Sequence, residues 1–104
     1  MPFAIDPAEL ARWRAASACR LLDVREAWEL EICRFDEARH IPLGELPGRL
    51  DEVPDDVPVV AVCHHGVRSA RATAFLRGRG VRAVNLHGGI DAWARTIDTA
   101  MAVY

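Results

Sequence analysis

The stretch from Val59 to Ser69 constrains the fold most strongly, because it combines a buried strand, a tight loop and the start of a helix. Four apolar residues, three of them Val, come directly before Cys63. Their length and β-branching predict a short buried strand over 59–62. The run from Ser69 to Gly78 is rich in helix formers and is followed by a second glycine at position 80. The sequence therefore predicts that Cys63 lies at the end of a strand, in a loop that leads into a helix.

A thiol in this position has a definite chemical setting. A loop that enters a helix presents unpaired backbone N–H groups and the positive end of the helix dipole, and both favour the thiolate of Cys63. Gly66 permits a positive φ angle close to the sulfur, Arg68 supplies a fixed cation, and the Ser69 hydroxyl is expected to cap the helix. A lone cysteine after a strand is more often a small buried apolar residue. The surrounding residues instead favour a nucleophile that attracts and attacks an anion.

The rest of the chain alternates strands and short helices around this stretch. A chain of 104 residues has room for one hydrophobic core, so we expect a single domain over residues 1–104. The alternation predicts an α/β fold with a parallel sheet covered by helices on both faces. Further strands are predicted over 19–25 and 81–86, and further helices over 7–16 (with Asp6 as its N-cap), 27–32 and 46–50. Because functional crevices lie at the carboxyl ends of such strands, Asp23 and Arg25 are expected to approach Cys63.

Charge is unevenly distributed along the chain, although the formal net charge is only −2. All but two of the 15 acidic residues lie before residue 57, and there is none from Val57 to Ile90. The loop therefore lies in the basic half, whose positive field suits an anionic substrate or an acidic partner surface. The low net charge gives no indication of nucleic-acid binding.

Targeting signals and paired cysteines are both missing from the sequence. No apolar run approaches the roughly 20 residues of a membrane span, and the first residues do not resemble a signal peptide. Three cysteines without paired spacing argue against a disulfide framework. We therefore expect a cytoplasmic, reducing location in which Cys63 is free to react. Cys19 and Cys33 are expected to be core or boundary thiols, and a resolving role for either stays open.

Four motifs together resemble the rhodanese family of sulfurtransferases. They are Cys63-x-x-Gly-x-Arg-Ser, Asp23-Val-Arg-Glu, His40-Ile-Pro and the Gly88-Gly-x-x-Ala-Trp turn. Phe35-Asp36-Glu37 stands where related sequences often carry Pro-Gly, which affects only the expected loop geometry. The tail Ile97–Tyr104 resembles the ends of rhodanese domains fused to adenylyltransferases. The resemblance extends from about Pro7 to Trp93 and implies a rhodanese-like α/β fold with about five parallel strands.

The resemblance also implies a reaction. Cys63 would take the outer sulfur of thiosulfate or of a persulfide, hold it as a cysteine persulfide, and pass it to cyanide, a thiol or a sulfur-carrier protein. No cofactor is required. The substrate-binding loop would consist of His64, His65, Gly66, Val67, Arg68 and Ser69, with Asp23, Arg25 and His40 as supporting residues. Of these, Asp23 and Arg25 would brace the site, or would form only a surface ion pair, and His40 fixes a turn more readily than it serves as a general base.

Three other interpretations compete with sulfur transfer. Adjacent histidines such as His64 and His65 point in different directions and have no partners at metal-ligand spacing, so we predict no zinc site. Cysteine phosphatases and arsenate reductases resemble Cys-x-x-x-x-x-Arg, whereas only four residues separate Cys63 from Arg68. That smaller loop favours sulfane sulfur over a tetrahedral oxyanion. The remaining alternative is a rhodanese-like module that only binds or regulates, and the intact Cys63, Gly66 and Arg68 argue against it.

Overall fold

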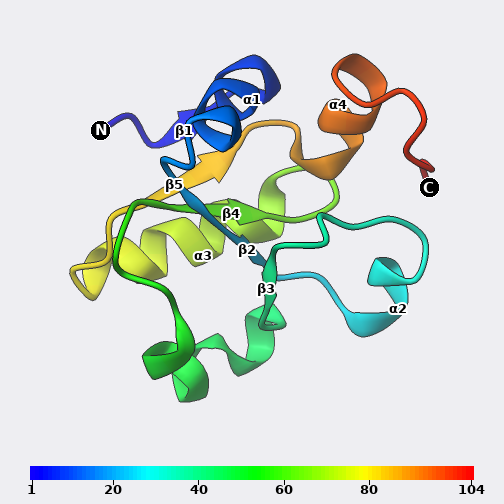
Figure 1. Cartoon of the computed structure of the whole chain (residues 1–104). Helices are drawn as coiled ribbons and strands as arrows, with labels where there is room; N and C mark the ends of the chain where they lie inside the picture. Colours follow the sequence, from blue (N-terminus) through cyan, green and yellow to red (C-terminus); the bar gives the residue numbers. More distant parts are fainter.

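A parallel five-stranded sheet forms the centre of the computed structural model, which describes residues 1–104 (Figure 1). The strand order is β1-β5-β4-β2-β3. The central strand β4 (Val59–Val62) pairs with β2 (Arg20–Asp23) on one side and with β5 (Ala83–Leu86) on the other. All four residues of β4 are buried, as expected for a strand covered on both faces. The two edge strands, β1 (Ala4–Ile5) and β3 (Arg39–His40), are only two residues long.

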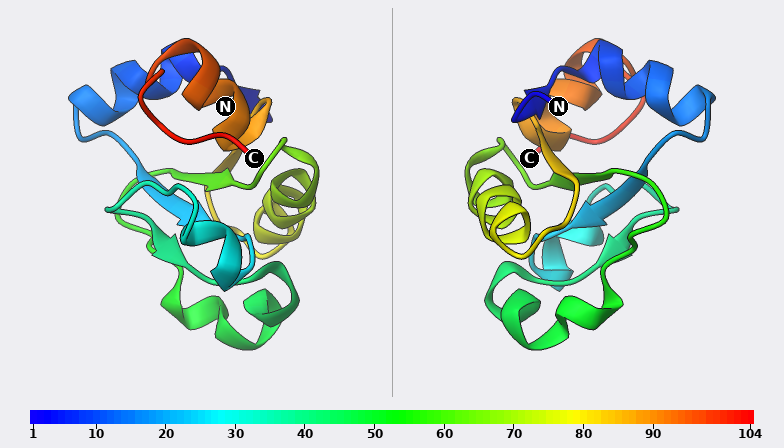
Figure 2. Two further views of the ribbon diagram at one scale, coloured as in Figure 1. Left: turned by 90° about the vertical axis from the view of Figure 1, so that its right-hand side faces the viewer. Right: turned by 90° about the vertical axis from the view of Figure 1, so that its left-hand side faces the viewer.

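Helices cover both faces of the sheet (Figure 2). On one face α1 (Pro7–Ala15) packs beside α4 (Gly89–Thr96), and their core residues include Leu10, Ile90 and Trp93. On the other face α3 (Val67–Gly78) packs beside the 3₁₀ segment η1 (Leu43–Glu52). The short helix α2 (Ala27–Leu30) follows β2. None of these helices combines the length and the apolar character needed to cross a bilayer.

The side chains of β4 divide between two cores because successive residues of a strand point to opposite faces. Val60 and Val62 join the core under α1 and α4. Val59 and Ala61 join the core under α3 and η1, and Cys63 continues that alternation into the same core. The sulfur of Cys63 therefore lies on the face of the sheet that α3 covers, at the end of the central strand.

The predicted α/β class, the parallel sheet and the helices on both faces are confirmed. The predicted strands over 19–25, 59–62 and 81–86 correspond to β2, β4 and β5. The helix predicted over 46–50 was too short at both ends, because η1 begins at Leu43 and ends at Glu52, with non-helical backbone at Arg49. The helix predicted over 27–32 ends early, at Leu30.

Two consecutive glycines connect β5 to α4 and bring that helix against the loop after β4. Gly88 and Gly89 both have positive φ angles, +77° and +65°. A Cβ atom on Gly89 would lie only 2.3 Å from the carbonyl oxygen of His64. This close approach lets Ile90 N–H donate to the Cys63 carbonyl at 2.9 Å and Asp91 N–H donate to the His64 carbonyl at 3.1 Å. The start of α4 thus holds the backbone of Cys63 and His64 in place.

We predict that Gly89→Ala destabilises the fold by at least about 2 kcal/mol, because the new methyl group would collide with backbone atoms at a positive φ angle. The measurement is the free energy of unfolding in urea. Gly78→Ala is the matched control. Gly78 lies in α3, and a methyl group added there would have no neighbouring atom within 4 Å, so this change should leave stability unchanged or raise it slightly. Equal stabilities for the two variants would contradict the packing described.

Candidate active site

The carboxyl ends of β2, β4 and β5 bring the candidate residues to one edge of the sheet. Cys63 follows β4 directly, and its residue surface is only 1% exposed. The amide N–H of Gly66 donates to the Cys63 sulfur at 3.0 Å, and the Ser69 hydroxyl lies 3.2 Å from the same sulfur. Gly66 precedes the first residue of α3 in a left-handed conformation, with φ +97°, which confirms the predicted positive angle. The sulfur therefore faces backbone and side-chain donors at a helix N-terminus.

The prediction that Ser69 caps the helix was wrong. The helix begins two residues earlier, at Val67, with Gly66 at the capping position. Ser69 is therefore inside the first turn and fully buried, and its hydroxyl reaches both Cys63 and the Asn85 side-chain oxygen, the latter at 2.6 Å. Asn85 also donates through its amide nitrogen to the Gly66 carbonyl at 3.1 Å.

A single hydroxyl proton cannot serve both of the Ser69 partners at once. When Cys63 is a neutral thiol, the proton can go to the Asn85 oxygen while the thiol donates to the hydroxyl. When Cys63 is a thiolate, the hydroxyl can turn its proton to the sulfur. The Ser69 hydroxyl can therefore donate to the Cys63 sulfur when that sulfur is negatively charged, and to Asn85 when it is not.

Arg68 is held by a carboxylate that the sequence analysis did not single out. Its guanidinium forms a two-pronged ion pair with Glu29 of α2, with nitrogen–oxygen distances of 2.6 and 2.8 Å. Glu29 is 2% exposed. The bond from Arg68 lowers the pKa of Glu29 to about 2, and the same bond raises the pKa of Arg68. Both groups are therefore charged at neutral pH, and the loop cation is compensated.

Tyr104, in the segment after α4, also reaches the loop. Its hydroxyl donates to Glu29 at 2.6 Å and accepts from the Arg25 guanidinium at 2.9 Å. Its ring stacks on His64, with centroids 3.7 Å apart and planes 5° from parallel. Burial, followed by the bond to Glu29, raises the pKa of Tyr104 to about 12, so the hydroxyl keeps its proton. Tyr104 therefore packs against the loop and links it to the buried Arg25.

The three predicted supporting residues lie at the ends of β2 and β3. Asp23 and Arg25 form a fully buried ion pair at 2.7 Å, and not a surface pair. Arg25 also donates to the Cys33 carbonyl at 2.8 Å. His40 contacts the Arg25 carbonyl at 2.7 Å through Nε2. The structure thus connects Asp23 and Arg25 to the loop through Tyr104 and Glu29, while His40 contacts backbone.

The prediction that His64 and His65 point in different directions was wrong, because their rings stack with centroids 3.8 Å apart and planes 28° from parallel. Burial, and then the neighbouring His65, lower the pKa of His64, and its buried Nε2 has no hydrogen-bond partner. Together with Asp91, they place three potential metal-ligand atoms within 4.8 Å of one another. Asp91, however, already pairs with Arg95 at 3.0 Å. Three donors are also fewer than a closed tetrahedral zinc site requires.

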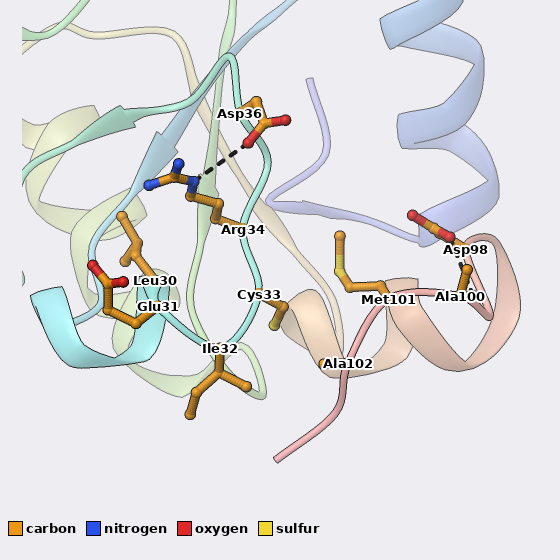
Figure 3. Close-up of a pocket in the computed structure, with 10 residues that line it drawn as sticks. All are labelled: Leu30, Glu31, Ile32, Cys33, Arg34, Asp36, Asp98, Ala100, Met101 and Ala102. Carbon is orange, nitrogen blue, oxygen red and sulfur yellow. Dashed lines mark hydrogen bonds and ion pairs between the residues drawn. The ribbon is translucent and has the colours of Figure 1, made fainter.

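A groove of about 420 Å³ lies away from this loop, between the segment after α2 and the segment after α4 (Figure 3). Cys33 and Met101 line it, and none of the residues from Cys63 to Ser69 does. Cys19 is half-buried, and burial raises the pKa of its thiol. No hydrogen bond joins Cys19 or Cys33 to Cys63. The groove is therefore a feature separate from the thiol site.

Sequence reasoning missed Glu29, Asn85 and Tyr104. Each comes from a different segment, and each reaches the loop only through the fold: Glu29 is 39 positions from Arg68. Glu29 looked like one of several acids on a short helix. Asn85 carried the one available signal, since a polar residue in the middle of the apolar run 83–86 needs a buried partner.

Comparison with known proteins gives a consistent result. A family model described as a rhodanese-like domain matches residues 6–96. A protein from Allochromatium vinosum named sulfurtransferase is 41% identical over 76 residues, which cover 72% of this chain and 71% of that one. The probable adenylyltransferase/sulfurtransferase MoeZ of Mycobacterium tuberculosis is 38% identical over 104 residues, covering 96% of this chain but only 26% of its own length.

Solved structures agree. A rhodanese-related protein from Thermoplasma volcanium superposes with a TM-score of 0.84 at 33% identity, covering 90% of this chain and 92% of that one. The chain belongs to the rhodanese family. Relatives named sulfurtransferases support that activity at the level of the family.

We predict that Ser69→Ala slows alkylation of Cys63 by iodoacetamide at neutral pH by about three- to tenfold, because the thiolate loses a hydrogen-bond donor. The rate is read by mass spectrometry of the peptide that contains Cys63. Thr73→Ala is the control: Thr73 is buried one turn further along α3 and bonds to the Ser69 carbonyl, not to the sulfur. An unchanged rate in Ser69→Ala would remove the hydroxyl from the account.

The ion pair of Glu29 predicts a pH dependence of stability. The pKa of Glu29 falls from 4.5 to about 2 on folding. The contribution of Glu29 to the free energy of unfolding is therefore complete above pH 4.5 and is lost as the pH falls toward 2. At neutral pH this shift corresponds to on the order of 3 kcal/mol. The wild-type protein should therefore exceed Glu29→Gln in stability at pH 7 and lose that advantage on acidification. Urea denaturation at a series of pH values measures it.

Glu31→Gln is the control for this series, because Glu31 is exposed and forms no ion pair in the structure. Its stability should follow that of the wild-type protein at every pH. A constant difference between wild type and Glu29→Gln across the whole series would show that Glu29 contributes no pH dependence.

Proposed function

We propose that this protein is a sulfurtransferase that carries sulfane sulfur on Cys63. The observation that carries the proposal is the pair of donors at the sulfur, the Gly66 amide at 3.0 Å and the Ser69 hydroxyl at 3.2 Å. Such donors stabilise a thiolate before the reaction and an anionic persulfide after it. Membership of the rhodanese family and relatives named sulfurtransferases support the same activity.

In the first half-reaction the Cys63 thiolate attacks the outer sulfur of the donor. A sulfur–sulfur bond forms to Cys63 while the sulfur–sulfur bond of the donor breaks, and the bonding electrons leave with sulfite or with a thiolate. In the second half-reaction a nucleophilic acceptor attacks the outer sulfur of the persulfide and restores the Cys63 thiolate. Cyanide serves as acceptor in an assay, and a thiol or a sulfur-carrier protein serves in the cell. Neither step requires a cofactor.

The remaining predicted residues have supporting roles in this proposal. In this proposal backbone N–H groups from His64 to Ser69 stabilise the anionic sulfur, and Arg68 contributes to donor binding while it stays paired with Glu29. The buried pair of Asp23 and Arg25 braces the loop, and His40 fixes the turn after β2. We propose that residues 1–104 act as one domain, in a reducing, cytoplasmic setting that keeps Cys63 free.

Intact-protein mass spectrometry after incubation with a sulfane-sulfur donor tests the proposal. We expect the wild-type protein to gain one sulfur atom and to lose it to cyanide as thiocyanate. Cys63→Ser should gain none, because the attacking sulfur is missing. Cys19→Ser and Cys33→Ser are matched controls that remove the other thiols and should still gain the atom.

Two results would contradict the proposal. The first is an adduct that persists in Cys63→Ser, which would place the reactive thiol elsewhere. The second is the absence of any adduct with both thiosulfate and persulfide donors, which would favour a rhodanese-like module that only binds or regulates.

A further inference from the structure

Arg68 is the one permanent cation in the loop from Cys63 to Ser69, and its charge is already compensated. Both carboxylate oxygens of Glu29 are engaged by the Arg68 guanidinium, at 2.6 and 2.8 Å. Two parallel hydrogen bonds between a guanidinium and a carboxylate are among the strongest polar contacts in proteins. A donor anion that approaches Cys63 therefore meets an ion pair and not a free positive charge.

Glu29 is anchored so that it cannot easily swing away from Arg68. One carboxylate oxygen accepts the hydroxyl of Tyr104 at 2.6 Å, and the other accepts the backbone N–H of Glu26 at 3.1 Å. Tyr104 is in turn held by Arg25 at 2.9 Å. With the two bonds from Arg68, the buried carboxylate receives four hydrogen bonds. To free Arg68 for a substrate, several of these contacts would have to break together.

Two further charged pairs lie beside the loop. Arg25 is neutralised by Asp23, both fully buried. Asp91, at the start of α4, pairs with Arg95. The lowered pKa of His64 leaves its imidazole neutral at pH 7. Within the loop itself, attraction of an anion toward Cys63 is therefore left to backbone N–H groups and the start of α3, which carry only partial charges.

We infer that Glu29 is a positioning residue that sets donor specificity: by neutralising Arg68 it selects persulfide donors over the thiosulfate dianion. This inference rests on the proposed function. Sulfur transfer from thiosulfate brings two negative charges to the loop and releases sulfite, also a dianion. Transfer from a persulfide forms the sulfur–sulfur bond to Cys63, breaks the one in the donor, and releases a thiolate with a single charge. A site that offers only partial positive charges stabilises the singly charged persulfide and thiolate better than the thiosulfate and sulfite dianions.

The test compares kcat/KM for two donors, thiosulfate and the persulfide of 2-mercaptoethanol, whose only ionisable group is the persulfide itself. The wild-type protein should prefer the persulfide. Glu29→Gln keeps the shape of the side chain but removes the charge, so Arg68 becomes an uncompensated cation. We expect it to raise kcat/KM for thiosulfate about tenfold and to change that for the persulfide by less than about threefold. The gain with thiosulfate should shrink as salt is added.

Glu31→Gln makes the same change of charge near the end of α2, at an exposed position, and should alter neither value by more than about twofold. A loss of fold in Glu29→Gln would lower both rates together, so it cannot imitate the expected change in preference. The wild-type preference needs no variant and tests the inference by itself.

The outcomes separate the inference from the proposed function. If the wild-type protein uses thiosulfate as efficiently as the persulfide, or if Glu29→Gln changes both donors equally, the role of Glu29 is wrong while sulfur transfer stands. If neither donor places sulfur on Cys63, the proposed function itself fails. A preference for the persulfide that shifts toward thiosulfate in Glu29→Gln supports both.

Discussion

The carbonyl groups of Cys63 and His64 accept hydrogen bonds from the first amides of α4, and the geometry of the thiol site depends on these two bonds. They are possible only because Gly89 lets the start of α4 approach the loop backbone more closely than any side chain would allow. These two hydrogen bonds hold the loop backbone in place, and in this conformation the Gly66 N–H donates to the Cys63 sulfur. The packing of α4 against the loop thus helps to position the backbone that surrounds the buried cysteine.

Charges around this loop are arranged in pairs. Arg68 is compensated by Glu29 and Arg25 by Asp23, and the hydroxyl of Tyr104 joins the two pairs. Such a network holds its members in fixed positions, because removing one partner would leave a buried charge without compensation. The same compensation reduces the field that a substrate meets. The same ion pairs therefore hold the loop in place and form the basis of the donor selectivity that we infer.

The sequence predicted the central part of the fold well, for physical reasons that differ from element to element. The apolar run at 59–62 and the helix formers after Ser69 specify local structure by themselves. Edge strands of two residues carry no such signal, so β1 and β3 could not be located. The start of α3 was misplaced because Gly66, and not Ser69, occupies the capping position. Hydroxyl side chains commonly cap helices, but here the fold uses that hydroxyl at the sulfur.

Only the part of the site that lies within one short stretch of sequence could be predicted. Cys63, Gly66 and Arg68 are close in sequence, whereas Glu29 and Tyr104 reach them only by tertiary packing. If backbone amides of this loop hold the transferred sulfur, ¹⁵N-resolved NMR of the protein before and after addition of a persulfide donor should detect the change at those amides. We predict shifts concentrated in the amides of residues 64–69, largest at Gly66 and reversed by a reductant. A gain of sulfur on Cys63 that leaves these amides unshifted would contradict the account.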